Sequence, residues 1–295
     1  MKDAANKIAE RTFGVELELE GISREVAART IQTVIGGEVR YAGTHYDTWA
    51  LTAPDGRVWK AMYDGSLYGT HAEVVPPILK MADLETLQKI LRALRAAGAK
   101  ASQRCGAHVH VGAADLNARQ LANLVKVFYR QEKLIVNACK VKRSRMNFAQ
   151  FTADDFLARI EHKRGIVTMR ELNEAWFGSY TPHPMHYDYH RYRTLNLNNL
   201  WNEKKTVEFR LFNGTTHAGQ LKANIQLALC LVTFAKEARA ASAKHQRTLN
   251  TNTSKYDVRV FLLRLGMIGE AFKTARHLLT KHLGGSTAWR GERRD

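Results

Sequence analysis

The octapeptide Phe13-Gly14-Val15-Glu16-Leu17-Glu18-Leu19-Glu20 has the most regular pattern in the chain, because apolar and polar residues alternate along most of its length. A period of two is typical of a β-strand with one buried face. The glutamates then share one side of the strand, about 6.6–7 Å apart, and repel one another unless a positive charge lies between them. A solvent-exposed polar face is the more common outcome of this pattern. A divalent cation that bridges Glu16 and Glu18 is the other interpretation.

Further strands and helices are predicted on the C-terminal side of this strand. Strands are expected at Trp49–Ala53 and Val58–Met62, joined by Pro54-Asp55-Gly56, and at Glu73–Val75, Ala107–Gly112, Thr194–Asn198 and Thr206–Phe212. Helices are expected after Ser23, over Leu84–Leu94, over Leu116–Ala138 and after the last strand. Short connections between the strands favour an α+β fold with an antiparallel or mixed sheet. A parallel, Rossmann-type sheet is the weaker interpretation, because no glycine-rich strand-to-helix turn is present.

The composition indicates one compact domain with a strong basic charge. The chain has 295 residues, five prolines, and neither a repeat nor a low-complexity linker. We therefore expect one domain over residues 1–283, followed by a basic, mobile tail over residues 284–295. The 45 lysines and arginines against 28 acidic residues give a net charge of +17. This charge favours anionic partners such as nucleotide phosphates, nucleic acid or acidic polymers, although a solvated basic surface would have the same composition.

Cysteine usage and hydropathy favour a cytoplasmic protein with no membrane segment. Cys105, Cys139 and Cys230 are far apart and odd in number, so neither a zinc ribbon nor a disulfide framework is expected. The N-terminus lacks the apolar run of a signal peptide. The most apolar helix, around Ile225–Ala235, is shorter than the ~20 residues that a bilayer requires.

Two histidines at a spacing of two form the second candidate site. His108 and His110 share one face of the predicted strand, whereas Val109 and Val111 face the core. A single histidine is usually structural or exposed, but a pair in this arrangement is more suggestive of a metal or phosphate site. The strand is flanked by glycines, which allow a ligand or another backbone to approach closely.

A third polar face combines acidic, basic and amide side chains. Glu208 and Arg210 share one side of their strand, and Asn196 and Asn198 are expected on a similar face of the preceding strand. A surface ion pair of small energetic value is one interpretation. The other is a metal-binding carboxylate beside a guanidinium that holds phosphoryl oxygens. Together with the glutamates and histidines, these groups suit Mg²⁺ or Mn²⁺ bound to a polyphosphate, and no P-loop is present to hold the phosphates otherwise.

Several short blocks occur in a fixed order between Phe13 and Val232. They are Phe13-Gly14-Val15-Glu16-Leu17-Glu18, Trp59-Lys60, Asp64-Gly65-Ser66-Leu67, Glu73-Val74-Val75-Pro76-Pro77-Ile78-Leu79, Cys105-Gly106-Ala107-His108-Val109-His110-Val111, Arg145-Met146-Asn147, Arg193-Thr194-Leu195-Asn196, Thr206-Val207-Glu208-Phe209-Arg210 and Asn213-Gly214-Thr215. In order and chemistry, these blocks together resemble the amidoligase family of the glutamine synthetase and glutamate–cysteine ligase superfamily.

The resemblance implies a fold, an activity and a set of site residues. The fold would be a curved, mostly antiparallel sheet with helices on its convex face, like the glutamine synthetase catalytic domain. The enzyme would bind ATP with Mg²⁺ or Mn²⁺, activate a carboxylate as an acyl phosphate and join it to an amine. The implied metal ligands are Glu16, Glu18, Glu73, His108 and Glu208. Phosphate contacts are implied for His110 and Arg210, and for the weaker candidates Lys60 and Arg193. The substrate end would be lined by Asp64, Asn196 and Asn198. The catalytic residues would be Arg210, Glu208 and Glu18.

Other classes of protein remain open from the sequence. The basic run Lys140-Val141-Lys142-Arg143-Ser144-Arg145 is compatible with a nucleic-acid-binding protein or a metal-dependent nuclease, although a solvated helix end is the commoner origin of such a run. A zinc hydrolase based on His108 and His110 lacks an obvious third ligand. The substrates of a ligase could be small molecules or peptides. The segment with His183, His186 and His190 is either a substrate-gating loop or a packed connection.

Overall fold

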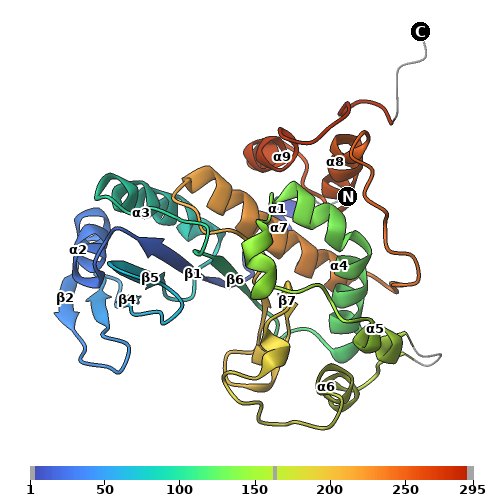
Figure 1. The fold of residues 1–295 in the computed structure, drawn as a ribbon, viewed down its shortest axis with the longest axis horizontal. Coiled ribbons are helices and arrows are strands. Elements are labelled where there is room, and N and C mark those ends of the chain that lie inside the picture. The colour runs from blue at the N-terminus through green and yellow to red at the C-terminus, as the bar shows by residue number, and fades with distance from the viewer. Residues whose placement is uncertain (1–3, 162–164, 291–295) are drawn as a thin grey trace.

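A single antiparallel sheet extends from one end of the molecule, at β2, to its middle, at β7 (Figure 1). The computed structural model describes residues 4–161 and 165–290. Its eight strands have the order β2-β3-β4-β5-β1-β6-β8-β7, and every neighbouring pair is antiparallel. The strands are β1 (Phe13–Glu20), β2 (Glu38–Tyr41), β3 (Trp49–Thr52), β4 (Val58–Met62), β5 (His71–Val75), β6 (Ala107–Gly112), β7 (Leu195–Asn196) and β8 (Thr206–Phe209). The prediction of a mostly antiparallel sheet is confirmed.

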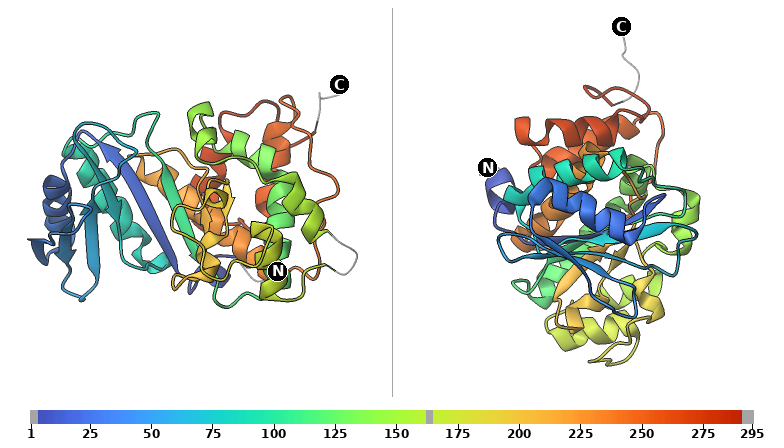
Figure 2. Two further views of the ribbon diagram at one scale, coloured as in Figure 1. Left: turned by 60° about the horizontal axis from the view of Figure 1, so that its bottom comes forward. Right: turned by 90° about the vertical axis from the view of Figure 1, so that its left-hand side faces the viewer.

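Helices cover the apolar face of this sheet. The helices of the described residues are α1 (Ala4–Ile8), α2 (Arg24–Ile35), α3 (Leu84–Ala96), α4 (Ala118–Ala138), α5 (Asp154–Ile160), α6 (Met169–Phe177), α7 (Ala218–Glu237), α8 (Ser254–Arg264) and α9 (Lys273–Thr280), and some of them lie away from the sheet. Figure 2 shows α2, α3 and α7 on the same side of the sheet. Helix α2 contacts β3, β4 and β5, and α7 contacts β6. The fold is therefore a mixed α/β architecture with the sheet's second face left for polar groups.

The central strand β1 shows why the two faces differ. Its apolar residues Phe13, Val15, Leu17 and Leu19 are at most 1% exposed and belong to the hydrophobic core. Burial of each such side chain contributes about 1.5–3 kcal/mol. Because alternate residues of a strand point to opposite sides, this burial forces the intervening glutamates onto the other face.

Helix starts follow the local sequence signals. Ser23 caps α2 and accepts a hydrogen bond from the backbone N–H of Val26 (3.2 Å), as expected. Helix α4 begins at Ala118, two residues later than predicted, because Asn117 and Gln120 form a reciprocal capping box. In the described part of the chain, no helix is long and apolar enough to cross a membrane.

The predicted strand Thr194–Asn198 is too long, and its last residue has a different role. Only Leu195 and Asn196 are in β7, and Asn198 starts a 3-10 helix that runs to Trp201. The Asn198 backbone N–H donates to Oδ1 of Asn196 (2.9 Å), a local turn that competes with strand pairing. The strand predicted for Thr206–Phe212 likewise ends at Phe209.

The segment after Leu283 contacts helix α8. The carbonyl oxygen of Gly284 accepts a hydrogen bond from the Lys255 N–H (3.0 Å), and Arg259 donates to the Thr287 carbonyl (3.3 Å). Residues 291–295 of the predicted mobile tail lie outside the described residues. The mobility of the tail and the single-domain boundary at residue 283 stay predictions.

Candidate metal and phosphate site

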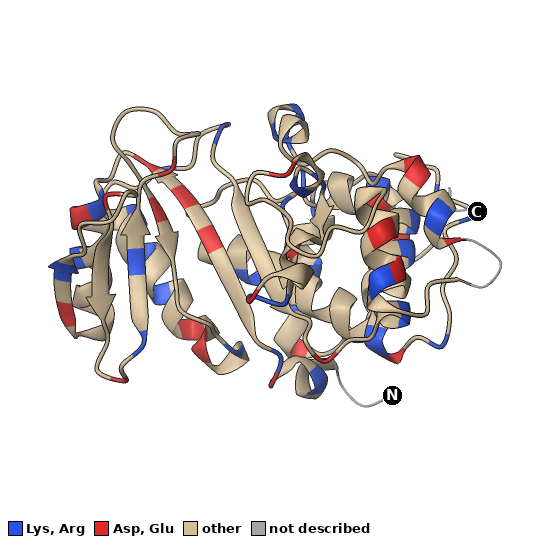
Figure 3. Cartoon of the chain, turned by 90° about the horizontal axis from the view of Figure 1, so that it is seen from below, with Lys and Arg blue, Asp and Glu red and all other residues tan. Residues whose placement is uncertain are grey.

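The strand register brings the predicted site residues onto one face of the sheet. Glu16 of β1 lies opposite His108 of β6, and Glu18 lies opposite Glu73 of β5. His110 lies opposite Glu208 of β8. Directly opposed residues of antiparallel strands project to the same side. Figure 3 shows acidic positions following one another along the central strand, seen from the side without α2 and α3.

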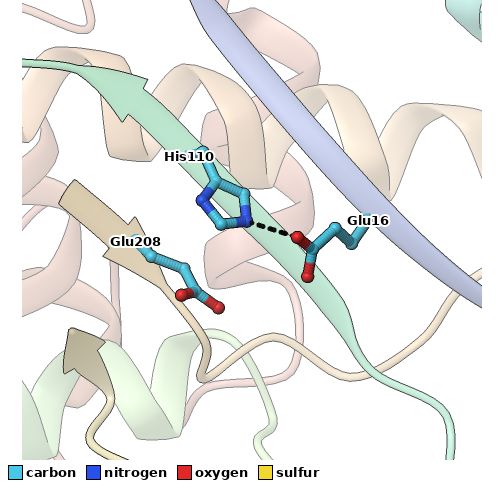
Figure 4. Close-up of side chains that lie close together, drawn as sticks. All are labelled: Glu16, His110 and Glu208. Carbon is cyan, nitrogen blue, oxygen red and sulfur yellow. Dashed lines mark ion pairs between the residues drawn. The ribbon is translucent and has the colours of Figure 1, made fainter. Parts of the chain in front are cut away.

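Glu16, His110 and Glu208 form the tightest set of possible metal ligands. One ligand atom from each residue lies within 4.8 Å of the other two. Nε2 of His110 is 3.1 Å from Oε1 of Glu16, and the three side chains converge from neighbouring strands (Figure 4). Nε2 of His110 is buried and makes no hydrogen bond of good geometry to any described residue. This donor set of two carboxylates and one imidazole fits a divalent cation such as Mg²⁺ or Mn²⁺.

The ionisation of these three residues reflects their mutual contacts. Burial favours the neutral acid, but His110 and His108 hold the pKa of Glu16 well below its usual range. Burial opposes a charged imidazole, but Glu16 and Glu208 nevertheless raise the pKa of His110. Both shifts favour a positive charge at the point where the three strands meet.

His108 is held by protein groups through both ring nitrogens. Its Nδ1 is 3.0 Å from Oε2 of Glu16, and its Nε2 is 3.1 Å from Nη2 of Arg145. A guanidinium can only donate, so Nε2 of His108 accepts in its contact with Arg145, while Nδ1 faces Glu16. The resemblance implied that His108 binds metal and His110 binds phosphate. Both roles stay predictions; the contacts show that each ring nitrogen of His108 faces a protein group, and that Nδ1 of His108 and Nε2 of His110 both lie beside Glu16.

Arg145 is a site residue that the sequence interpretation left without a role. Its side chain is 3% exposed, and its guanidinium lies 3.8 Å from Oε2 of Glu18 and donates to the Arg210 carbonyl (3.2 Å). Burial and the nearby Arg210 lower its pKa, and the charge of Glu18 opposes that shift. The basic run at residues 140–145 suggested a surface patch, and exposure cannot be read from charge alone. The sequence signal that could have found Arg145 was its place in the block Arg145-Met146-Asn147.

Gly106 makes room for this guanidinium. A Cβ atom at position 106 would lie 2.5 Å from Nη2 of Arg145. The Gly106 backbone N–H also donates to Oε2 of Glu18 (2.5 Å). The glycine before β6 was expected to allow close approach of a ligand or a backbone. The group that approaches is the Arg145 side chain.

Glu208 is fixed by an ion pair and an amide. Nη1 of Arg210 donates to its Oε1 (2.5 Å), and Nδ2 of Asn196 donates to its Oε2 (2.7 Å). All three residues are at most 5% exposed. Burial opposes ionisation of Glu208, but Arg210, His110 and His108 lower its pKa to about 2. The ion pair of Glu208 and Arg210 is therefore buried and not on the surface, and the role of Glu208 as a metal ligand stays a prediction.

Glu73 is a carboxyl group whose charged form is disfavoured by its surroundings. Burial and the charges of Glu16, Asp64, Glu18 and Glu208 raise its pKa well above the usual range. No hydrogen bond or ion pair to Glu73 is found in residues 4–161 and 165–290. A cation added near Glu73 would offset the neighbouring carboxylates and favour its charged form.

The remaining predicted residues lie at different distances from this cluster. Lys60 of β4 is exposed on the same face as Glu73, with β5 between it and β1. Asp64 follows β4 and its Oδ1 caps a turn at Ser66 (2.7 Å). Arg193 is not brought into the cluster, because Nη1 of its guanidinium donates to the Phe151 carbonyl (3.1 Å). Asn198 faces α6, where its Oδ1 accepts from Nε1 of Trp176 (2.7 Å).

The aromatic segment before β7 has one packed and one exposed part. His190 packs edge-on against Phe177 at 5.2 Å and lies 2.7 Å from Oδ1 of Asp188. Tyr187 is 67% exposed, and a hydrogen bond with Tyr46 raises its pKa. Tyr46 precedes β3, near the opposite edge of the sheet. His190 thus belongs to a packed part of the segment, and the substrate-gating role stays a prediction.

The fold and the site together define a mixed α/β protein whose antiparallel sheet presents candidate metal ligands on one face. The profile of the family described as "Putative amidoligase enzyme" matches residues 9–232. The chain belongs to this amidoligase family, and the resemblance of its motif blocks is confirmed. No curated protein matches the sequence.

Proposed function

We propose that the protein is an ATP-dependent carboxylate–amine ligase that forms an amide bond through an acyl phosphate. The observation that carries this proposal is the convergence of Glu16, His110 and Glu208 from three strands within metal-ligand distance. Family membership supports ligase chemistry. A carboxylate and an amine do not condense unaided at neutral pH, so activation by phosphoryl transfer is the step that the enzyme has to supply.

The proposed mechanism assigns a task to each part of the cluster. Glu16, His110 and Glu208 would hold Mg²⁺ or Mn²⁺, with Glu18 and Glu73 as further carboxylates, and the bound cation would neutralise charge on the transferring phosphoryl group. The substrate carboxylate attacks the γ-phosphorus and ADP leaves. Arg210, already oriented by Glu208, stabilises the negative charge that develops. The amine then displaces phosphate from the acyl phosphate.

The glutamine synthetase-like form of the fold belongs to the same proposal. In that form the polar face of the sheet is concave and α2, α3 and α7 cover its convex face. The single antiparallel sheet with helices on its apolar face supports this arrangement. A concave face would exclude water from the acyl phosphate and hold both substrates together.

The substrates are a carboxylic acid and an amine, either small or within a peptide. In a narrower form of the proposal, one of the two substrates is an anionic polymer. This form is supported by exposed Lys140 and Arg143, which lie in the same segment as the buried Arg145. Binding of an oligonucleotide with a steep dependence on salt concentration would support this form; binding that salt does not change would contradict it.

Hydroxylamine trapping tests the proposed intermediate. The protein is incubated with ATP, Mg²⁺, hydroxylamine and a panel of amino acids and dipeptides, and hydroxamate and ADP are measured. We expect both products with at least one acid and neither product for the Glu208→Gln variant. Glu20→Gln is the matched control, because Glu20 is on the same strand but its Oε1 accepts from Ser102 (3.0 Å) outside the cluster. Absence of nucleotide binding with Mg²⁺ would contradict the proposal.

A further inference from the structure

A cavity lies among the helices, away from the sheet. Its volume is about 440 Å³. Its lining residues come from α4, the C-terminal end of α7, the segment 240–247 and α8, and none of them is in a strand. The segment 240–247 and α8 follow residue 232, where the match to the amidoligase family ends. The family assignment therefore gives this cavity no role.

The charged residues that line the cavity are all basic. They are Arg130, Arg247 and Arg264, with His245 beside them, and no aspartate or glutamate is among the described lining residues. Nη1 of Arg247 is 3.1 Å from Oδ1 of Asp257 and is therefore neutralised. Arg130 and Arg264 have no ion-pair partner within residues 4–161 and 165–290. Two unneutralised guanidiniums at one cavity attract an anion.

The rest of the lining is largely apolar. Val127 of α4, Phe234 of α7, and Val260, Phe261 and Leu265 at α8 supply aliphatic and aromatic surface. Specific small-molecule sites combine such surface with a few polar groups that fix the orientation of the ligand. The cavity thus offers a cationic side and an apolar side to the same occupant.

Hydrogen bonds to α4 hold the rim of the cavity in place. The Arg247 backbone N–H donates to the Arg130 carbonyl (2.9 Å), and Nε2 of Gln246 donates to the Tyr129 carbonyl (3.2 Å). Oε1 of Gln131, another lining residue, is buried without a hydrogen-bond partner in the described part of the chain. An unpartnered buried acceptor is costly, and a ligand with a donor group would satisfy it.

We propose that this cavity binds an organic anion. A carboxylate or phosphate head contacts the guanidiniums of Arg130 and Arg264, because planar guanidiniums recognise these oxyanions with paired hydrogen bonds. The apolar body of the ligand lies against Phe261 and Val260. This site does not depend on the proposed ligase activity, because it shares no residue with the sheet face.

Isothermal titration calorimetry with four probes tests the ligand class. Phenyl phosphate and 4-phenylbutyrate have both an anionic head and an apolar body, inorganic phosphate has only the head, and benzyl alcohol has only the body. We expect at least tenfold tighter binding of one two-part probe than of phosphate or benzyl alcohol. The better of the two two-part probes identifies the head group. Equal binding of inorganic phosphate and both two-part probes would overturn the proposal.

Two variants locate the binding. The double variant Arg130→Ala/Arg264→Ala should bind the preferred probe at least tenfold more weakly. Ala241→Phe should abolish binding by filling the cavity. Arg119→Ala is the matched control, since Arg119 is an exposed arginine of α4, the helix of Arg130, and does not line the cavity. Circular dichroism and thermal melting verify that each variant folds. Unchanged affinity in folded Ala241→Phe would show that the probe binds elsewhere, and the proposal would fail.

Discussion

Charged side chains gather at two places in this molecule, and they are held in opposite ways. On the sheet face, guanidiniums and carboxylates contact one another, and Glu73 is surrounded by four further acidic groups. At the helical cavity, Arg130 and Arg264 lack an ion-pair partner among the residues that the structure describes. The first place has a surplus of acidic residues and the second a surplus of basic residues.

The difference shows how one basic protein can favour ligands of both signs. A net charge of +17 predicts anionic partners, but it says nothing about where they bind. The burial of each charge decides whether the protein has to pair it, because a buried charge needs a partner and an exposed one does not. Substitutions on the sheet face should therefore affect stability strongly, whereas those at the cavity should affect ligand binding alone.

Removal of Glu208 should have the largest effect. Glu208→Ala leaves the buried Arg210 without its carboxylate, which we expect to lower the free energy of unfolding by about 3–5 kcal/mol. Binding of an ATP analogue with Mg²⁺ should be lost as well. Urea titration and calorimetry measure the two effects. Glu203→Ala, at an exposed position before the same strand, should change neither, and a cost below about 1 kcal/mol for Glu208→Ala would contradict the pairing.

A buried carboxylate held by hydroxyls should respond to pH in the opposite direction from a salt bridge. Burial raises the pKa of Glu132 from 4.5 to about 7, although hydrogen bonds from Thr194 and Thr152 favour its charged form. The folded state thus binds a proton that the unfolded state has lost, and stability falls as pH rises from about 4.5 through 7. The free energy of unfolding of Glu132→Gln should therefore rise relative to that of the wild type between pH 4.5 and pH 8. The change in this difference should be up to about 3 kcal/mol.

Urea titrations at the two pH values measure this difference. The half-buried Glu174, substituted in the same way, should show no such gain. A constant difference between the wild type and Glu132→Gln at both pH values would show that Glu132 is ionised throughout.

The packing of Arg145 against Gly106 predicts a smaller effect with a specific rescue. Gly106→Ala should cost about 1–3 kcal/mol, because the new Cβ would overlap the guanidinium. The flexible Met side chain of Arg145→Met can move away, so the cost of Gly106→Ala should shrink in the double variant. Chemical denaturation of all four proteins gives the coupling energy. Additive costs would show that the two residues do not share this space.

The arginines of the cavity should have the smallest effect on stability. Arg264→Ala removes no ion pair of the described chain, so the free energy of unfolding should change by less than about 0.5 kcal/mol. The same substitution should weaken binding of the preferred organic anion. Thermal melting with and without the probe separates the two effects. A loss of stability without ligand would mean that Arg264 is structurally held, as Arg210 is.

The regular parts of the fold could be read from the sequence because their patterns are local. Strand β1 follows its period of two from Phe13 to Glu20, and the glutamates, histidines and Glu208 were expected on polar faces. The alternation of apolar and polar residues does not show where a side chain lies once its strand has ended. Asn198 was expected beside Asn196 but starts a 3-10 helix, and Arg193 bonds to a neighbouring segment instead of the cluster.

The roles of the basic residues were hardest to predict. Arg145 belongs to a run that looks like a solvated surface, and only the three-dimensional contact with His108 distinguishes it from its exposed neighbour Arg143. The cavity was not predicted either, because it joins α4 to a segment more than a hundred residues later. Such contacts depend on tertiary packing rather than on the local pattern.

The pairing of β1 with β6 and of β6 with β8 has a consequence for folding kinetics. Glu16, His110 and Glu208 come from strands that are distant along the chain, so their ligand atoms meet only after both pairings have formed. A cation bound there would stabilise the native state more than the transition state. Its presence should then slow unfolding and leave the rate of folding nearly unchanged.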